Sequence, residues 1–382
     1  MKGMKKSYSI LLASLLCCCS AVAVPQVIEG EAGSGAKYLI TVPDNWNGDL
    51  VVYAHGIIEP FIPVVMPFKD DIDALRDTFV SNGYAVAYSS YSANGFAVQE
   101  GVLDTRYVNS VFIRNFGQPE RTFLVGHSLG GAVCVKLAEL HPNQYDGVLT
   151  VAGMIGGSQA EIEYVSNVRI LWEFFYPGVL PGEIYEVPAG VDLMNEVVYP
   201  LIAAVTADPT GAGAIALIDQ TPVPWDFVNG AELVQSYAVA MGFWYIYLDD
   251  VKERTGDKGF YDNTEIDYTS FILPEITMAG INAYVERFKG SNQAERYLWR
   301  YFEPTGKIST PHLSLHNTRD PAVPAFHEAL YGQLVAVQGN SDLLVQRISD
   351  RYGHTETYPA EEVFDAFLEL VDWVDSGVAP TP

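Results

Sequence analysis

The sequence predicts an α/β fold in which a mostly parallel central sheet is covered by helices. Short apolar runs alternate with helical stretches from about residue 36 to 155, and the alternation resumes after residue 307. Strands that alternate with helices are typical of parallel sheets, because each crossover between parallel strands is long enough to hold a helix. The chain has 382 residues, of which 49% are hydrophobic, so it can bury a large core.

The expected strands are apolar runs bounded by turn residues. They cover residues 37–42, 49–54, 84–88, 121–125, 148–151, 311–316 and 343–348. The polar turn at 44–48 separates the first two of these runs. The expected helices have apolar residues at helical spacing. They cover residues 71–81, 102–116, 130–140, 325–337 and 361–374. Asn82-Gly83 ends the first helix, and the strongly periodic last helix closes the fold.

The pattern changes between residues 156 and 307, where aromatic residues are frequent and helical stretches are broken by proline and glycine. The strands after residue 307 need a sheet to join, so we interpret this segment as an insertion. The predicted division is a signal peptide at 1–23, an α/β core at 24–155 and 308–382, and a cap at 156–307. Two independent domains in sequence are the alternative.

The first 23 residues have the layout of a secretory signal peptide. Lysines 2, 5 and 6 precede an apolar run at residues 10–19, and Ala21-Val22-Ala23 offers a cleavage site of small residues. The run is short for a membrane span, so we expect a secreted or periplasmic protein with no stable span after cleavage. A retained anchor, and a lipid anchor at the cysteines of residues 17–19, are the less favoured alternatives.

Charge and cysteine content restrict the partners. The chain has 22 Lys and Arg against 47 Asp and Glu, a formal net charge of −25, which argues against nucleic-acid binding. Cys134 alone remains after signal cleavage, so we expect no internal disulfide and an inert core thiol. Acidic clusters at residues 70–73 and 262–267 could hold calcium, although a solvated face is favoured for both. We expect no metal and no cofactor in the site.

A candidate nucleophile stands in the sequence Gly126-His127-Ser128-Leu129-Gly130. An apolar strand pattern precedes this sequence, and an apolar helical pattern follows it. A turn from strand to helix with serine at its apex is crowded, so the residues two positions before and after the serine must be glycine-sized. Such a turn exposes the serine hydroxyl above a helix N-terminus. The spacing therefore predicts a nucleophile elbow with Ser128 at its apex.

A serine hydroxyl needs a base to become a good nucleophile, and the base needs a carboxylate to orient it. His354 is the favoured base, because it lies in a loop after the last expected strand, where such sheets bind their ligands. Asp320 is the favoured acid, because it follows the strand at 311–316 and reaches the same sheet edge. Asp146 and Asp350 are weaker candidates for the acid.

The strand–elbow–helix unit, with Ser128, Asp320 and His354 in that chain order, resembles the α/β-hydrolase superfamily. The resemblance covers about 36–155 and 308–376, and it implies a cap after the sixth strand. It also implies an oxyanion hole made by the backbone amides of Leu129 and, from the sequence His-Gly-Ile after an early strand, Ile57. A longer His-Gly-Gly-Gly sequence is absent, which argues against the branch that resembles hormone-sensitive lipase.

These residues predict a secreted carboxylic-ester hydrolase that works through an acyl-enzyme. The aromatic cap suggests a hydrophobic or polymeric ester as substrate. An exported serine peptidase of the same fold is the alternative, and acids of the cap such as Glu161, Glu163 and Glu186 could then bind a peptide amino terminus. A non-catalytic binding module is less favoured, because all three triad positions are present.

Overall fold

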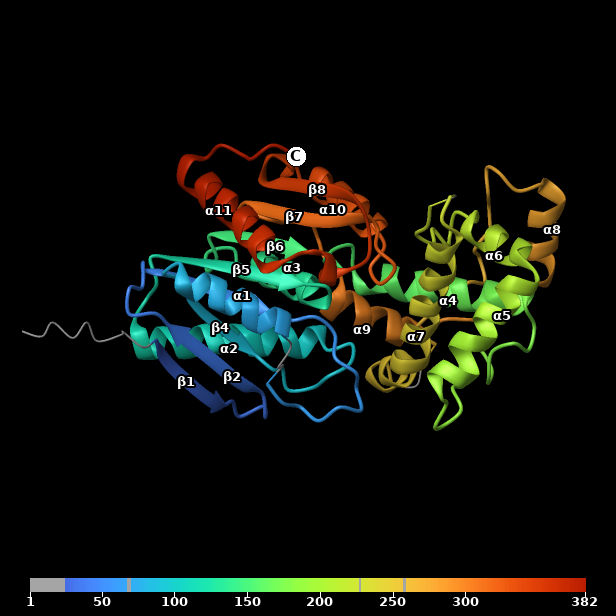
Figure 1. Cartoon of the computed structure of the whole chain (residues 1–382), viewed down its shortest axis with the longest axis horizontal. Coiled ribbons are helices and arrows are strands. Elements are labelled where there is room, and N and C mark those ends of the chain that lie inside the picture. The colour runs from blue at the N-terminus through green and yellow to red at the C-terminus, as the bar shows by residue number, and fades with distance from the viewer. Residues whose placement is uncertain (1–24, 67–69, 227, 257–258) are drawn as a thin grey trace, which may run out of the picture.

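The computed structural model describes residues 25–66, 70–226, 228–256 and 259–382 (Figure 1). The predicted signal peptide lies outside the described residues, so export stays a prediction. Among the helices of the described ranges, none combines the length and apolar character that a membrane crossing requires.

A single eight-stranded sheet organises the molecule, in the order β1-β2-β4-β3-β5-β6-β7-β8. β1 and β2 join the sheet antiparallel, and the strands from β4 to β8 are parallel to one another. The predicted mostly parallel sheet is therefore confirmed. The strands are β1 (Gln26–Glu31), β2 (Lys37–Val42), β3 (Asp49–Ala54), β4 (Ala85–Ser89), β5 (Arg121–His127), β6 (Gly147–Val151), β7 (His312–Arg319) and β8 (Leu344–Tyr352).

The central strands are apolar on both faces, as expected for a parallel sheet covered on both sides. All six residues of β3 are buried. Leu50 and Val52 pack into the hydrophobic cluster on one face, and Val51 and Tyr53 pack into the cluster on the other. The sheet therefore separates two hydrophobic cores.

Helices cover both faces of the sheet. α1 (Asp70–Ser81) and α11 (Ala360–Ser376) pack on one face, where the rings of Phe79 and Phe367 meet edge to face at 4.8 Å. α2 (Val98–Phe116) and α3 (Leu129–Leu140) pack on the other, and α10 (Phe326–Val337) packs beside α3. Cys134 of α3 is buried, and burial raises the pKa of its thiol.

A helical segment is inserted between β6 and β7, which are neighbours in the sheet. We call residues 152–311 the inserted segment. Its α-helices are α4 (Ser158–Phe175), α5 (Tyr199–Ala207), α6 (Pro209–Ala216), α7 (Gly230–Arg254), α8 (Glu275–Tyr284) and α9 (Asn292–Phe302). Figure 1 shows α5, α6 and α8 gathered at one end of the molecule, beyond the sheet. The expected helical insertion after the sixth strand is thus present, whereas its division as a domain at residues 156 and 307 stays a prediction.

β7 and β8 continue beyond their expected ends, to Arg319 and Tyr352. Two further local predictions differ from the structure. β1 was not predicted, because the polar sequence of residues 26–31 lies at an exposed sheet edge and lacks a buried face. α2 begins at Val98 and not at residue 102, and Val98 and Gly101 of its first turn are buried. Neither difference changes the positions of the residues that form the candidate site.

Candidate active site

Ser128 lies at the sharp turn between β5 and α3. Its backbone has a φ of 54°, a left-handed conformation that is strained for a residue with a side chain. Two backbone hydrogen bonds keep Ser128 in this conformation. The Ser128 N–H donates to the Val151 carbonyl, and the Ser128 carbonyl accepts the Met154 N–H. These contacts tie the turn to the end of β6.

The glycines on either side of Ser128 are required by close backbone contacts. A Cβ at Gly130 would lie 2.1 Å from the carbonyl oxygen of Ala54 in β3. A Cβ at Gly126 would lie 2.4 Å from the carbonyl oxygen of Gly130 and 2.6 Å from Sγ of Cys134. Both positions thus meet the steric requirement on which the predicted elbow was based.

Asp320 and His354 are brought into contact from the ends of neighbouring strands. Asp320 directly follows β7 and His354 lies just after β8, and Nδ1 of His354 is 2.7 Å from Oδ2 of Asp320. The other oxygen of Asp320, Oδ1, accepts the backbone N–H groups of Ala322 at 2.9 Å and Val323 at 3.0 Å. Asp320 is fully buried, and the side chain of His354 is 16% exposed. A buried carboxylate held in this way fixes the imidazole ring and leaves its Nε2 for another partner.

The weaker candidate acids have other partners. Asp350 is exposed and pairs with Arg319. Asp146 accepts the backbone N–H of Thr122 at 2.7 Å. Both contacts support the choice of Asp320 over these two residues.

A cavity of about 270 Å³ is lined by several of the predicted site residues. Its walls include Ser128, Leu129, Ile57 and His354, which lie at or near the ends of sheet strands. The wall also includes His127, whose ring contacts Tyr53 with centroids 5.6 Å apart. The structure therefore gathers the predicted nucleophile, base and oxyanion-hole residues around one space, with Asp320 directly behind His354.

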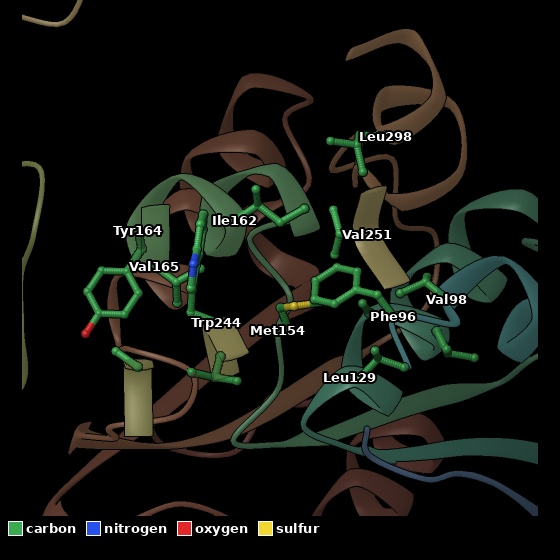
Figure 2. Close-up of a cluster of buried hydrophobic side chains, with 14 of the residues drawn as sticks. Phe96, Val98, Leu129, Met154, Ile162, Tyr164, Val165, Trp244, Val251 and Leu298 are labelled. Carbon is green, nitrogen blue, oxygen red and sulfur yellow. The ribbon is translucent and has the colours of Figure 1, made fainter. Parts of the chain in front are cut away.

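The inserted segment supplies part of the cavity wall. Met154, Phe243 and Tyr247 line it, next to Phe96 from the loop before α2. Figure 2 shows the Met154 side chain beside the ring of Phe96, near Leu129. These side chains make one side of the cavity apolar.

The loop that carries Ile57 is held by contacts from two sides. Gly56 packs so closely on Ser128 that a Cβ there would be 3.2 Å from the Ser128 Cβ. The Gly95 N–H donates to the Ile58 carbonyl at 2.8 Å, and the next amide, of Phe96, donates to Oδ2 of Asp250 at 2.7 Å. Asp250 belongs to α7, so the inserted segment supports the loop through residues 95 and 96.

Arg254 completes this support. Its Nε donates to both oxygens of Asp250, and its Nη2 donates to the Asn94 carbonyl at 2.8 Å. Glu100 pairs with the same guanidinium at 3.0 Å. We call Asp250 and Arg254 the α7 clamp. No sequence motif predicts the clamp, because it joins residues more than 150 positions apart.

Glu161 is a buried acid in the wall of the cavity. Its Oε2 lies 2.9 Å from Nε2 of His327, whose Nδ1 accepts the Gly156 N–H at 3.2 Å. Burial, with Asp320 nearby, raises the pKa of Glu161 well above its ordinary value, and burial lowers the pKa of His327 to about 3. Burial therefore disfavours the charged form of both groups. Of the three cap acids named from the sequence, Glu161 lines this cavity, whereas Glu186 is exposed.

Comparisons with known proteins identify the architecture. The feruloyl esterase B of Aspergillus oryzae superposes with a TM-score of 0.54 at 15% identity, covering 93% of this chain and 80% of that one. The chain has the α/β-hydrolase fold. The sheet order, the strained serine turn and the helical insertion are consistent with this fold.

Other similarities are more distant or shorter. An o-phthalyl amidase from Xanthobacter agilis is 28% identical over 138 residues, which is 32% of this chain. The match spans about a quarter, 26%, of the amidase. The esterase Pf2001 of Pyrococcus furiosus superposes with a TM-score of 0.42 at 13% identity, over 92% of this chain and 90% of that one. No family model matches the sequence.

Proposed function

We propose that this protein is a secreted serine hydrolase that cleaves carboxylic esters, with Ser128 as nucleophile, His354 as base and Asp320 as orienting acid. The observation that carries the proposal is the 2.7 Å contact between His354 Nδ1 and Asp320 Oδ2 at the wall of a cavity that Ser128 also lines. The α/β-hydrolase fold supports the same assignment, because this fold places a serine, an acid and a histidine at these three strand ends.

The mechanism follows from the positions of these groups. The Oγ atom of Ser128 attacks the ester carbonyl carbon while Nε2 of His354 takes the hydroxyl proton. The Asp320 carboxylate stabilises the imidazolium that forms. The backbone amides of Leu129 and Ile57 hold the oxyanion of the tetrahedral intermediate, a contribution of about 3 kcal/mol for each donor.

The acyl-enzyme forms and breaks with balanced proton transfers. His354 returns its proton to the alcohol oxygen, the C–O bond breaks, and the acyl group stays on Ser128. A water molecule then gives a proton to His354 and attacks the acyl carbon. Collapse of the second intermediate releases the carboxylic acid, and His354 returns the proton to Ser128.

The cavity favours a compact apolar group on the substrate. Its volume of about 270 Å³ is slightly below the ~300–1,000 Å³ of typical sites for drug-sized ligands. Met154, Phe96 and Phe243 supply apolar walls. We therefore propose that this cavity takes a short acyl chain or a single ring. A larger alcohol part, including that of a polymeric ester, would extend beyond the cavity.

Amide hydrolysis is the second candidate. Glu161 in the cavity wall favours it, because a buried carboxyl can bind an amine or amide group of a substrate. The partial match to an o-phthalyl amidase adds support, although it covers about a third of this chain. The same triad and oxyanion hole would serve both reactions.

Hydrolysis of p-nitrophenyl acetate, butyrate, octanoate and palmitate tests the first proposal. We expect fast turnover of the two short esters, and loss of turnover in Ser128→Ala. A matched series of acyl p-nitroanilides tests the amide alternative with the same chromophore class. If the folded protein leaves every ester and anilide intact and does not react with an electrophilic phosphonate, the serine-hydrolase proposal is wrong and a binding module is favoured.

A further inference from the structure

A second histidine, His316, lies behind Asp320. It stands in β7, four residues before Asp320, and has no exposed surface. Its Nε2 is 2.8 Å from the carbonyl oxygen of Val323 and 3.7 Å from Oδ2 of Asp320. Its Nδ1 is 3.2 Å from Oε1 of Glu328. The ring therefore lies between two buried acids, and the catalytic steps proposed above do not use it.

Glu328 is a buried carboxyl on α10 that is surrounded by hydrogen-bond donors. Ser314 donates to its Oε1 and Gln346 donates to its Oε2, each at 2.6 Å. A carboxylate that is 1% exposed needs a positive partner as well as neutral donors, because burial of an unpaired charge is costly. His316 is placed to be that partner.

His316 also fixes the turn that positions Asp320. With a proton on Nε2, His316 donates to the Val323 carbonyl, and the Val323 N–H in turn donates to Oδ1 of Asp320. The turn at residues 320–323 is thus fixed from both sides. Movement of the His316 ring would release the backbone donors that fix the Asp320 carboxylate.

We propose that His316 is a positioning residue for Asp320, and that it acts as a buried imidazolium paired with Glu328. It anchors the turn after β7 through Val323, and its positive charge offsets the second buried carboxylate behind the active site. The charge balance around Asp320, and therefore the pH at which His354 works as a base, depends on this histidine. The proposal rests on the proposed serine-hydrolase function.

The groups around His316 support this charge assignment. Burial by itself lowers the pKa of His316, but its contacts with Glu328 and Asp320 raise the pKa above the ordinary value. Burial raises the pKa of Glu328, yet the contacts with His316 and its other donors bring it below the ordinary value. His327 on α10 and Glu161 on α4 face the same region, and burial disfavours the charged form of each.

The pH dependence of kcat/KM on p-nitrophenyl butyrate distinguishes this role from a packing role. His316→Gln keeps a donor near the Nε2 position and removes the charge. We expect the acidic limb of its profile to move to higher pH by about one unit, because a nearby positive charge no longer opposes protonation of the base. The double variant His316→Gln/Glu328→Gln removes one charge of each sign, so its acidic limb should return towards that of the wild type.

Each other outcome overturns the proposal. If His316 is neutral, His316→Gln leaves the limb in place and the double variant moves it to lower pH. If the role is packing alone, both variants lose thermal stability and neither moves the limb. Nitrogen NMR of histidine-labelled wild-type protein reports the charge of His316 without any measurement of activity. Two protonated nitrogens in the His316 ring at pH 7 support the proposal, and a neutral His316 ring rejects it. Ester turnover that survives in Ser128→Ala would instead reject the proposed function.

Discussion

Replacement of Asp320 by asparagine is expected to remove most of the activity while leaving the fold intact. The Oδ1 atom of Asp320 accepts two backbone N–H groups, from Ala322 and Val323. An asparagine must keep its oxygen at this position, because its NH₂ group would otherwise face two donors. The NH₂ group then points at Nδ1 of His354, which must accept a hydrogen bond instead of donating one.

This reversal places the proton of His354 on Nε2, the atom that should take the proton of Ser128. A base held in the wrong tautomer lowers kcat by about 10⁴-fold, which corresponds to about 5.5 kcal/mol of barrier. The loss of one carboxylate that pairs with the imidazolium is part of the same effect. The two backbone donors fixed at Oδ1 are therefore the reason for expecting so large a loss from a change of one atom.

The assay is steady-state hydrolysis of p-nitrophenyl butyrate by the wild type, Asp320→Asn and Asp350→Asn. Asp350 is the matched control, since it is an exposed acid in β8 that pairs with Arg319. We expect the control to stay within about twofold of the wild type and both variants to melt cooperatively. A folded Asp320→Asn variant that keeps a tenth or more of the wild-type kcat would refute the tautomer argument.

Three further changes test the structure around the site. Gly130→Ala places a Cβ 2.1 Å from the Ala54 carbonyl oxygen and should lower the free energy of unfolding by more than ~3 kcal/mol. Gly242→Ala on α7 is the control, because its Cβ meets nothing within 4 Å, and it should be neutral or stabilising by up to ~1 kcal/mol. Urea unfolding measures both. Asp250→Asn should lower kcat about tenfold with little change in KM, because the α7 clamp holds the loop of the predicted oxyanion hole; an unchanged kcat would contradict this role. Burial raises the pKa of Glu303 to about 7, so folding binds a proton there and stability should fall as pH rises from about 4.5 to 7. Glu303→Gln should therefore be more stable than the wild type at pH 8 by up to about 3 kcal/mol and equal to it at pH 4. Equal stability at both pH values would show that folding does not raise the pKa of Glu303.

The parts of the site that the sequence predicts are those set by local geometry. Gly126 and Gly130 are glycine because the turn at Ser128 is crowded, and this requirement is visible in a five-residue pattern. Asp320 and His354 could be chosen because each follows a late strand of a parallel sheet, and the ends of such strands meet at one edge. Their contact in the structure agrees with that reasoning.

The parts that the sequence does not predict depend on contacts between distant segments. Glu161 was named as one of several cap acids, and its burial beside His327 follows from packing of α4 against the start of α10. Asp250 stands in no motif of the sequence, although it accepts the amide of Phe96 in the structure. No periodicity or motif records these pairings, because each brings together segments that lie more than 150 residues apart.

The adjacency of β6 and β7 has a consequence for how the substrate range of this protein could be redesigned. The inserted segment leaves and re-enters the sheet between two neighbouring strands, so a different segment could be grafted there without reordering the strands. A graft would also remove α7, and with it the clamp on residues 94–96. A chimera that exchanges the substrate wall must therefore carry a replacement for Asp250 and Arg254, or it would lose catalytic rate together with the old specificity.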